Sequence, residues 1–412
     1  MGPMDFYFDV RDIFRAPRLA LSGKKIWIFV IGNLTGYILY WVFSYLSLIM
    51  AGMTFADAIS QYGLYPYLFG NEAKWYAWVI YFIGLEAWFL AIFMAYTSVS
   101  RVTFKQLKGN DFFSAGDAWQ YTNKHWHPIV FAPIAILLII AFFLGFASIF
   151  ALIGKIPFVG EFLFAVPYFF YFFGSVFTVY TAIVFIVSLL YTPAIVGTYE
   201  EDTMGTVFQS YSITWSQPWR VIAYNAVLIP LVVIGLYLLS LSWSAGFWLV
   251  NYVFGCDWFM GMGTKFSAMV NYATSLVFMD SMCSLLASFC CYVSSFLNQC
   301  LTTYFFYFDL SLPTTTVPLS GTESVASVFL AISFFILLLS VLSYALSIIA
   351  VGETIMFIIF KKKSDDDNLL DRKDEDELEE DMEDDFDFDD DELENTDSDN
   401  ISSDDTSSEE KA

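Results

Sequence analysis

The sequence predicts an all-α, polytopic helical membrane protein with about six transmembrane helices, interfacial amphipathic helices and a disordered acidic C-terminal tail. Of its 412 residues, 57% are hydrophobic and 20% aromatic, well above the apolar share of ordinary soluble domains. Six apolar stretches are each long enough to cross ~30 Å of hydrocarbon as a helix. The chain then ends in a strongly acidic run.

The first 25 residues are expected to form an interfacial helix. In "MDFYFDVRDIFRAPR" one helical side is acidic, and another is basic through Arg11 and Arg15. The third side is apolar and consists of Phe6, Val10, Ile13 and Phe14. The phenylalanines would enter the bilayer, the arginines would reach lipid phosphates, and the acids would face water or a basic partner.

Six spans follow within a membrane domain that covers residues 26–360. We place them near residues 26–50, 75–98, 129–153, 168–192, 220–245 and 325–350. Lysine and arginine concentrate on the cytoplasmic side of a membrane. Thirteen of them flank one set of span ends and three flank the other. We therefore expect both termini to be cytoplasmic, in a plasma membrane that is most simply a bacterial inner membrane.

The outer segment 246–323 is harder to assign, because it is apolar but rich in Ser, Thr and Asn. Outer helices that lie on the surface or re-enter the membrane are favoured. A hidden helical hairpin, giving eight spans, would also keep both termini on one side. All five cysteines fall in this segment, so bridging among them remains open.

A second interfacial helix is predicted in "GTYEEDTMGTVFQSYSITWSQPWR", between the fourth and fifth spans. An apolar stripe at helical spacing consists of Met204, Val207, Phe208, Tyr211 and Trp215. Thr and Ser occupy the other faces, which we expect to meet water. A similar order of Tyr-Thr, aromatic-Gln and Trp-x-Pro occurs 89 to 95 residues earlier, which suggests an internal duplication.

Two groups of candidate site residues emerge. The interfacial docking candidates are Arg11, Arg15, Trp119, Trp126, Trp215, Trp219 and Arg220. The intramembrane polar candidate is Glu86 with Asn33 and Asn225, because an ionisable group at mid-span costs about 3 kcal/mol. Glu86 would either bind a proton or cation, or be neutral and hydrogen-bonded to one of the asparagines. Glu353, eight residues before Lys361, is expected to reach the interface.

Motifs for catalysis, metal ions and cofactors are missing from the sequence. The two histidines, His125 and His127, are at a spacing that does not share a helix face, and a metal site would need a third ligand. No phosphate loop, nucleophile elbow or zinc-protease motif is present. We therefore expect a protein that is not an enzyme, with no metal and no cofactor.

The tail, residues 361–412, holds 26 acidic and six basic side chains, whereas the preceding 360 residues hold 17 and 13. Like charge at this density prevents collapse, so we expect disorder. A nearly neutral membrane domain with an acidic tail argues against nucleic acid as a partner.

The stretch "YTPAIVGTYEEDTMGTVFQSYSITWSQPWRVIAYNAVLI" resembles the membrane domain attached to some bacterial glycerophosphodiester phosphodiesterases and related uncharacterised multi-pass membrane families. There, a span exit leads to an acidic patch, a Ser-containing amphipathic helix and another span. The soluble phosphodiesterase barrel is absent, so the resemblance implies a membrane module without assigned catalytic residues. The arrangement of spans is also similar to permease subunits of some ATP-binding-cassette exporters.

Two functional hypotheses follow from these patterns. The first is a non-catalytic membrane protein whose cytoplasmic face docks a protein partner, through the surface helices or the acidic tail, or organises the lipid bilayer. The alternative is a permease subunit that needs a separate ATPase, with Glu86 near its path.

Overall fold

The structure is a computed structural model that describes residues 6–255, 262–277 and 319–372. The chain divides into two units, Met1–Asp367 and Asn368–Ala412, and all the helices described below belong to the first. Within the described residues every regular element is helical. Six of these helices are long and apolar enough to cross a membrane. The all-α polytopic class is therefore confirmed.

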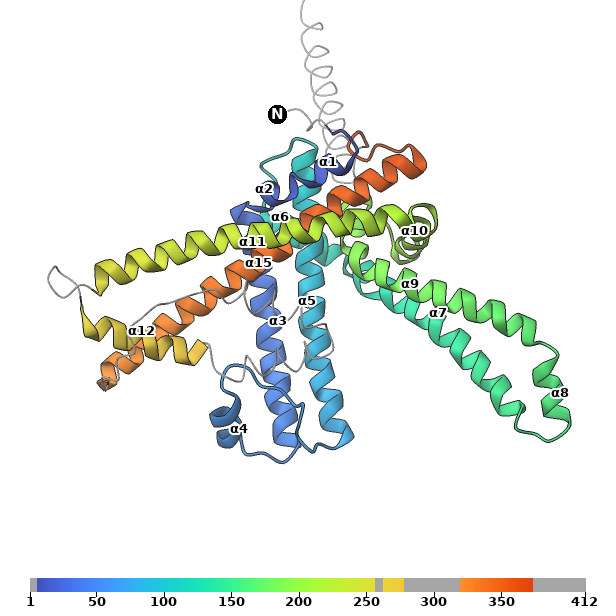
Figure 1. The fold of residues 1–412 in the computed structure, drawn as a ribbon, viewed down its shortest axis with the longest axis horizontal. Helices are drawn as coiled ribbons and strands as arrows, with labels where there is room; N and C mark the ends of the chain where they lie inside the picture. Colours follow the sequence, from blue (N-terminus) through green and yellow to red (C-terminus); the bar gives the residue numbers. More distant parts are fainter. Residues whose placement is uncertain (1–5, 256–261, 278–318, 373–412) are drawn as a thin grey trace, which may run out of the picture. The chain divides into compact units, whose positions relative to one another are not determined.

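The helices follow one another in three similar sets, each with one or two short helices, a long helix, a further short helix and a second long helix (Figure 1). The first set contains α1 (Val10–Ile13), α2 (Ala16–Ala20), α3 (Gly23–Met50), α4 (Phe55–Tyr62) and α5 (Trp75–Leu107). The second contains α6 (Ala115–Lys124), α7 (Trp126–Ile153), α8 (Val159–Ala165) and α9 (Tyr168–Tyr199). The third contains α10 (Thr203–Ser216), α11 (Pro218–Phe254), α12 (Thr264–Val277) and α15 (Gly321–Asp365).

The long helices pack as three antiparallel pairs, α3 with α5, α7 with α9, and α11 with α15 (Figure 1). We call the end at which α3, α7 and α11 begin, and α5, α9 and α15 finish, the junction end. The opposite end is the distal end. Contacts between pairs involve α5 with α9, and α15 with α3, α5 and α9. The helix ends that carry most of the lysines and arginines are thus the ends that share the junction.

Each predicted span lies within one long helix, but several helices are longer than hydropathy suggests. The second span was expected to end at residue 98, yet α5 continues to Leu107. The last was expected to end near residue 350, or at most 360, yet α15 continues to Asp365. Polar residues in these extensions are buried against neighbouring helices, so the loss of hydropathy does not mark the end of the helix.

The predicted N-terminal helix is instead two short helices, α1 and α2. Pro17 lacks the amide hydrogen that would bond to the carbonyl group of Ile13, so a continuous helix is interrupted there. Ile13 is fully buried while Phe14 is exposed. The expected apolar stripe therefore does not face one environment, because part of it is buried in the protein and part is exposed.

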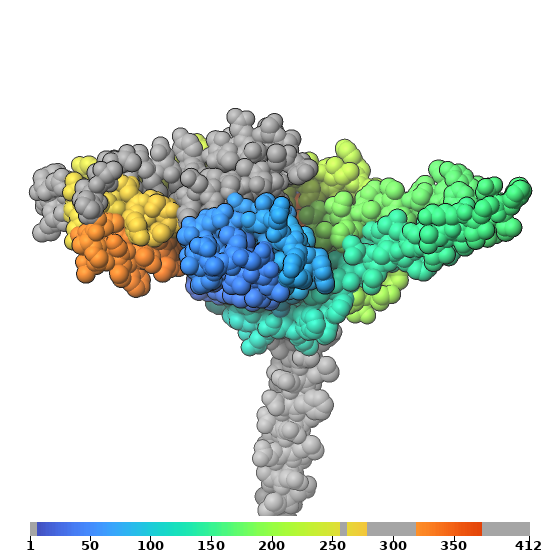
Figure 2. All heavy atoms as spheres, turned by 90° about the horizontal axis from the view of Figure 1, so that it is seen from below, coloured from blue at the N-terminus to red at the C-terminus, as the bar shows by residue number. Residues whose placement is uncertain are grey.

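Burial is concentrated at the junction end. Residues 350–361 of α15 and residues 191–198 of α9 are buried on every side. The later half of α7 and the first turns of α9 are largely exposed, and the green atoms of this pair have much of their surface uncovered in Figure 2. A helix that is apolar and buried all round is a core helix, and α15 has this role where the pairs meet.

Glycines allow the close helix crossings. A Cβ atom on Gly197 of α9 would lie 2.8 Å from Cβ of Ser100 on α5. One on Gly352 of α15 would lie 2.5 Å from a methyl carbon of Leu228 on α11, and one on Gly32 of α3 would lie 2.6 Å from Cβ of Ala95. Small residues let backbones approach where no hydrophobic force draws helices together in lipid.

The described part of the outer segment contains the end of α11 and α12. Helix α12 packs along the first half of α15, and the two helices run in the same direction. Near their starts Lys265 pairs with Glu323. Further along, Val270, Ala273 and Val277 cluster with Ala331 and Phe334. The remainder, with the cysteines and any extra hairpin, lies outside the described residues.

The start of the predicted tail is helical, since α15 includes residues 361–365. Asp366 ends the helix in a left-handed conformation, and its carboxylate pairs with the Lys362 ammonium at 2.8 Å. The lysine lowers the pKa of Asp366 through this contact. Residues 373–412, for which disorder is predicted, lie outside the described part.

Candidate functional site

The predicted polar group of Glu86, Asn33 and Asn225 does not assemble. Glu86 is exposed on α5, and among the described residues it makes no hydrogen bond to either asparagine. The Asn33 amide is buried and donates to the Phe29 carbonyl at 2.9 Å. The Asn225 amide donates to the Tyr191 hydroxyl at 2.7 Å. Hydropathy located these residues in the spans but not on the correct helix faces.

Glu353 has a buried carboxylate within the spans. The expectation that it reaches the interface was wrong. Glu353 is 1% exposed on α15, and the Tyr96 hydroxyl of α5 donates a hydrogen bond to it. The cause is the path of α15, which is covered by α3, α5 and α9 at this level. Its position near Lys361 therefore does not bring Glu353 to the surface.

One helical turn further along α15, Met356 meets the second tyrosine of the repeated Tyr-Thr pattern. The Tyr191 hydroxyl lies 3.4 Å from the Met356 sulfur and accepts the Asn225 amide bond. The two Tyr-Thr pairs, at 96–97 and 191–192, thus both place a tyrosine against α15. This recurrence, which suggested an internal duplication, is the sequence signal that could have located the buried centre, and hydropathy gives no such signal.

A buried ion pair joins α5 to the end of α9. The Arg101 guanidinium is 2.8 Å from the Glu200 carboxylate, and its side chain is fully buried. It also lies 4.2 Å from the centre of the Tyr121 ring of α6, and the Tyr121 hydroxyl donates to the Val196 carbonyl at 2.7 Å. Glu200 lies two residues before Asp202, which caps α10 by accepting the amide hydrogen of Gly205 at 2.7 Å.

The lysines that end α15 contact neighbouring elements as well as solvent. Lys361 is buried, with its ammonium 4.6 Å from the Tyr199 ring and 3.3 Å from the Gln209 amide oxygen of α10. Lys363 pairs with Asp9, just before α1, at 3.1 Å. These cations hold the short helices to the junction end.

Helix α10 buries part of its expected polar side against protein. Thr206, Ser210 and Thr214 are buried against protein, and each hydroxyl bonds to the carbonyl group four residues earlier. Val207 is also buried, in a cluster with residues of α7 and α9. The prediction that the polar side meets water was wrong, because small hydroxyl side chains permit close packing and satisfy themselves on their own helix.

Three large apolar residues of α10 face outward. Met204, Phe208 and Trp215 are exposed, and Trp219 and Ile222 of α11 continue the series. We call these five residues the outer stripe. Arg220 follows Trp219 in sequence, is half-buried, and donates to the Gln217 side chain at 3.2 Å. Three of the predicted docking residues, Trp215, Trp219 and Arg220, therefore lie close in sequence where α10 is followed by α11.

The other docking candidates are separate. Trp119 is half-buried on α6, and Trp126 is exposed at the start of α7. Arg11 is exposed on α1. Arg15 lies 5.6 Å from the Tyr7 ring and 3.7 Å from an Asp12 oxygen.

The chemistry of the junction is that of a satisfied polar core. Glu353, Arg101, Glu200 and Lys361 each have a protein partner, as the distances above show. Within the described ranges, no three His, Cys, Asp or Glu side chains gather to hold a metal ion. No family model, curated protein or solved structure matches the chain. The features open to the surroundings are instead the outer stripe and its arginine.

Proposed function

We propose that the chain is a non-catalytic multi-pass membrane protein that organises lipid at its junction end. The observation that supports this most is the outer stripe, a series of exposed apolar side chains where α10 is followed by α11, with Arg220 next to Trp219 in sequence. Tryptophan and arginine together favour the headgroup region, where rings meet the acyl boundary and a guanidinium meets phosphate. The outer stripe would thus contact anionic lipid.

The charge pattern supports a cytoplasmic location for the junction end and for both termini, in a plasma membrane such as a bacterial inner membrane. On this orientation α1, α2, α6 and α10 lie at the cytoplasmic leaflet, whose anionic lipids attract Lys and Arg by about 1 kcal/mol for each side chain near the surface. The proposed kinship with phosphodiesterase membrane domains rests on residues 191–229, which form the end of α9, α10 and the start of α11.

A lipid-enrichment experiment tests this proposal. The full chain would be reconstituted in mixed phosphatidylcholine and phosphatidylglycerol vesicles, extracted in mild detergent, and its retained lipids counted by native mass spectrometry. We expect retained phosphatidylglycerol to fall about fivefold in Arg220→Gln, the equivalent of ~1 kcal/mol. A Trp215→Ser, Trp219→Ser variant should lower total retained lipid.

A matched control exists at the distal end. Trp75 is 78% exposed, close to the 77% of Trp215 and 74% of Trp219, so Trp75→Ser removes an equally accessible ring away from the outer stripe. Unchanged enrichment in the outer-stripe variants, or an equal loss in Trp75→Ser, would reject lipid organisation there and leave protein docking as the use of this surface.

A permease subunit is the second proposal. It is supported by α6 and α10, since each is a short helix that joins two long helices at the junction end, as coupling helices do. Such a subunit would bind an ATPase through α6 and α10. This alternative would be favoured if the chain co-purifies with an ATPase and Trp119→Ala in α6 abolishes the association. Repeated purification of the chain without an ATPase would count against it.

A further inference from the structure

An apolar groove lies between α11, α12 and α15 in their distal halves. Its volume is about 670 Å³. Aromatic and aliphatic side chains form most of its wall, among them Trp243, Phe247, Phe254, Phe266, Met269 and Phe329. Nearer the junction end α11 and α15 pack directly, with Leu236 against Val341 and Ala345. The groove is therefore a space beside α12, where contact between the two long helices is made by the rings of Phe247 and Phe334, whose centres are 5.6 Å apart.

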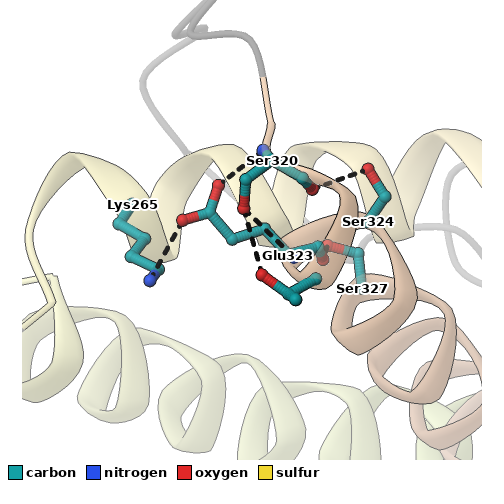
Figure 3. A network of polar contacts seen from close by, with 6 residues as sticks. Lys265, Ser320, Glu323, Ser324 and Ser327 are labelled. Atoms are coloured by element: carbon teal, nitrogen blue, oxygen red, sulfur yellow. Dashed lines mark hydrogen bonds and ion pairs between the residues drawn. The ribbon is translucent and has the colours of Figure 1, made fainter.

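One end of this groove carries a partly exposed cation. The Lys265 ammonium pairs with Glu323 at 3.0 Å, and their side chains are 55% and 21% exposed. Glu323 uses its other oxygen to accept the Ser320 amide hydrogen at 2.8 Å, as part of the capping box that begins α15 (Figure 3). An ammonium group has three donor hydrogens, and the ion pair occupies one.

The cation and the apolar wall are adjacent in both sequence and structure. Phe266 on α12 and Ala326 on α15 line the groove. Lys265 immediately precedes Phe266, and Glu323 lies one turn before Ala326. The site therefore has the polarity of an amphiphile, with one charged end and a long apolar body. Helices α11 and α15 are both candidates to span a membrane, so bilayer lipid is the amphiphile that surrounds the groove.

We propose that the groove holds one acyl chain of a phospholipid, whose phosphate is bound by Lys265. The hydrocarbon of the bilayer is as apolar as the groove wall. The preference for a lipid in the groove over an annular lipid therefore comes from the contact of its phosphate with Lys265 and from the fit of its chain among the wall side chains. This is a site at the distal end, separate from the outer stripe, and it goes beyond the proposed function.

Photo-crosslinking in vesicles tests the proposal. The full chain would be reconstituted in phosphatidylcholine with a small fraction of phosphatidylglycerol that carries a diazirine in its acyl chain. After illumination, modified residues would be mapped by mass spectrometry. We expect label on Phe247, Phe266, Met269 and Phe329 well above that on Phe142 and Phe146, which are exposed on α7. Labelling in proportion to exposure alone would overturn the proposal.

Variants that fill the groove sharpen the test. A Cβ atom on Gly246 meets no atom within 4 Å, and Gly246 lines the groove, so Gly246→Leu should fill it without a clash. Groove labelling should then fall to the level of α7. Gly145→Leu is the control, because Gly145 on α7 is equally open. Ser333→Leu narrows the groove from α15 and serves if Gly246→Leu unfolds.

The headgroup contact is tested separately. Lys265→Ala should reduce groove labelling by phosphatidylglycerol about fivefold, which corresponds to ~1 kcal/mol, whereas Lys74→Ala at the start of α5 should not. Persistence of full labelling in both Gly246→Leu and Ser333→Leu would reject the groove, and persistence in Lys265→Ala would reject its phosphate contact. Neither result depends on lipid enrichment at the outer stripe, so the two proposals fail independently.

Discussion

The junction end and the distal half of the α7–α9 pair are held together by different interactions. At the junction end, glycines bring backbones close, and buried polar side chains pair across helices, as Arg101 does with Glu200. In the distal half of the α7–α9 pair, aromatic rings such as Phe143 and Phe177 meet across the helices while most side chains face outward.

This difference shows where the fold obtains its specificity. Apolar side chains gain little from leaving lipid for protein, since the hydrocarbon is as apolar as they are. A buried polar group, by contrast, is costly unless its particular partner is present. Pairing at the junction end therefore selects one arrangement of helices, and the distal half of the α7–α9 pair is left to adapt to the bilayer.

The largest expected effect follows from removal of Arg101. Arg101→Ala leaves Glu200 with its partner lost at a mostly buried site, so the free energy of unfolding should fall by about 3–5 kcal/mol. Unfolding of the reconstituted protein by sodium dodecyl sulfate would measure this loss. Arg101→Met with Glu200→Gln, which removes both charges, should recover most of it. An Arg101→Ala variant as stable as wild type would break the comparison between the two ends.

A smaller difference is expected between two acids on the spans. Glu353→Ala leaves the buried Tyr96 hydroxyl without its acceptor, which should cost about 1–3 kcal/mol, and Glu353→Gln should cost less because an amide oxygen still accepts. Glu86→Ala removes an exposed carboxylate and should not destabilise the protein. The same unfolding assay compares the three variants. A larger loss from Glu86→Ala would show that its environment is as demanding as that of Glu353.

The smallest expected effect compares two glycines. The new methyl group of Gly197→Ala would lie 2.8 Å from Cβ of Ser100, and such overpacking costs about 1–3 kcal/mol, partly offset by up to ~1 kcal/mol of helix propensity. Gly145→Ala meets open space on α7 and should be neutral or stabilising. Thermal unfolding in detergent would separate them, and equal midpoints would contradict close packing at the junction.

The sequence predicted the helices better than it predicted which faces they bury. Length and hydropathy located all six long helices, and the lysine and arginine pattern grouped the ends that share the junction. Glu86 and Glu353 show the limit, because both lie in apolar runs and hydropathy does not report which neighbours cover them. Only the paths of α5 and α15 decide that one is exposed and the other buried.

The surface helices show a related limit. The apolar stripe of α10 was recognised, but amphipathicity does not specify whether the protein covers the apolar or the polar side. Small hydroxyl residues that bond to their own helix pack well against protein, so Thr206 and Ser210 became the buried face. At the N-terminus, by contrast, Pro17 was a visible signal for the break between α1 and α2.

The burial of residues 350–361 has a consequence for how the protein is made. This segment is the last part of the membrane domain to leave the ribosome, yet it supplies the acceptor for Tyr96 and the sulfur beside Tyr191, on helices synthesised long before. The first two helix pairs must therefore wait in the bilayer with incomplete polar contacts. Final assembly therefore follows the synthesis of α15, and a nascent chain that stops before α15 would present an unfinished centre to quality control.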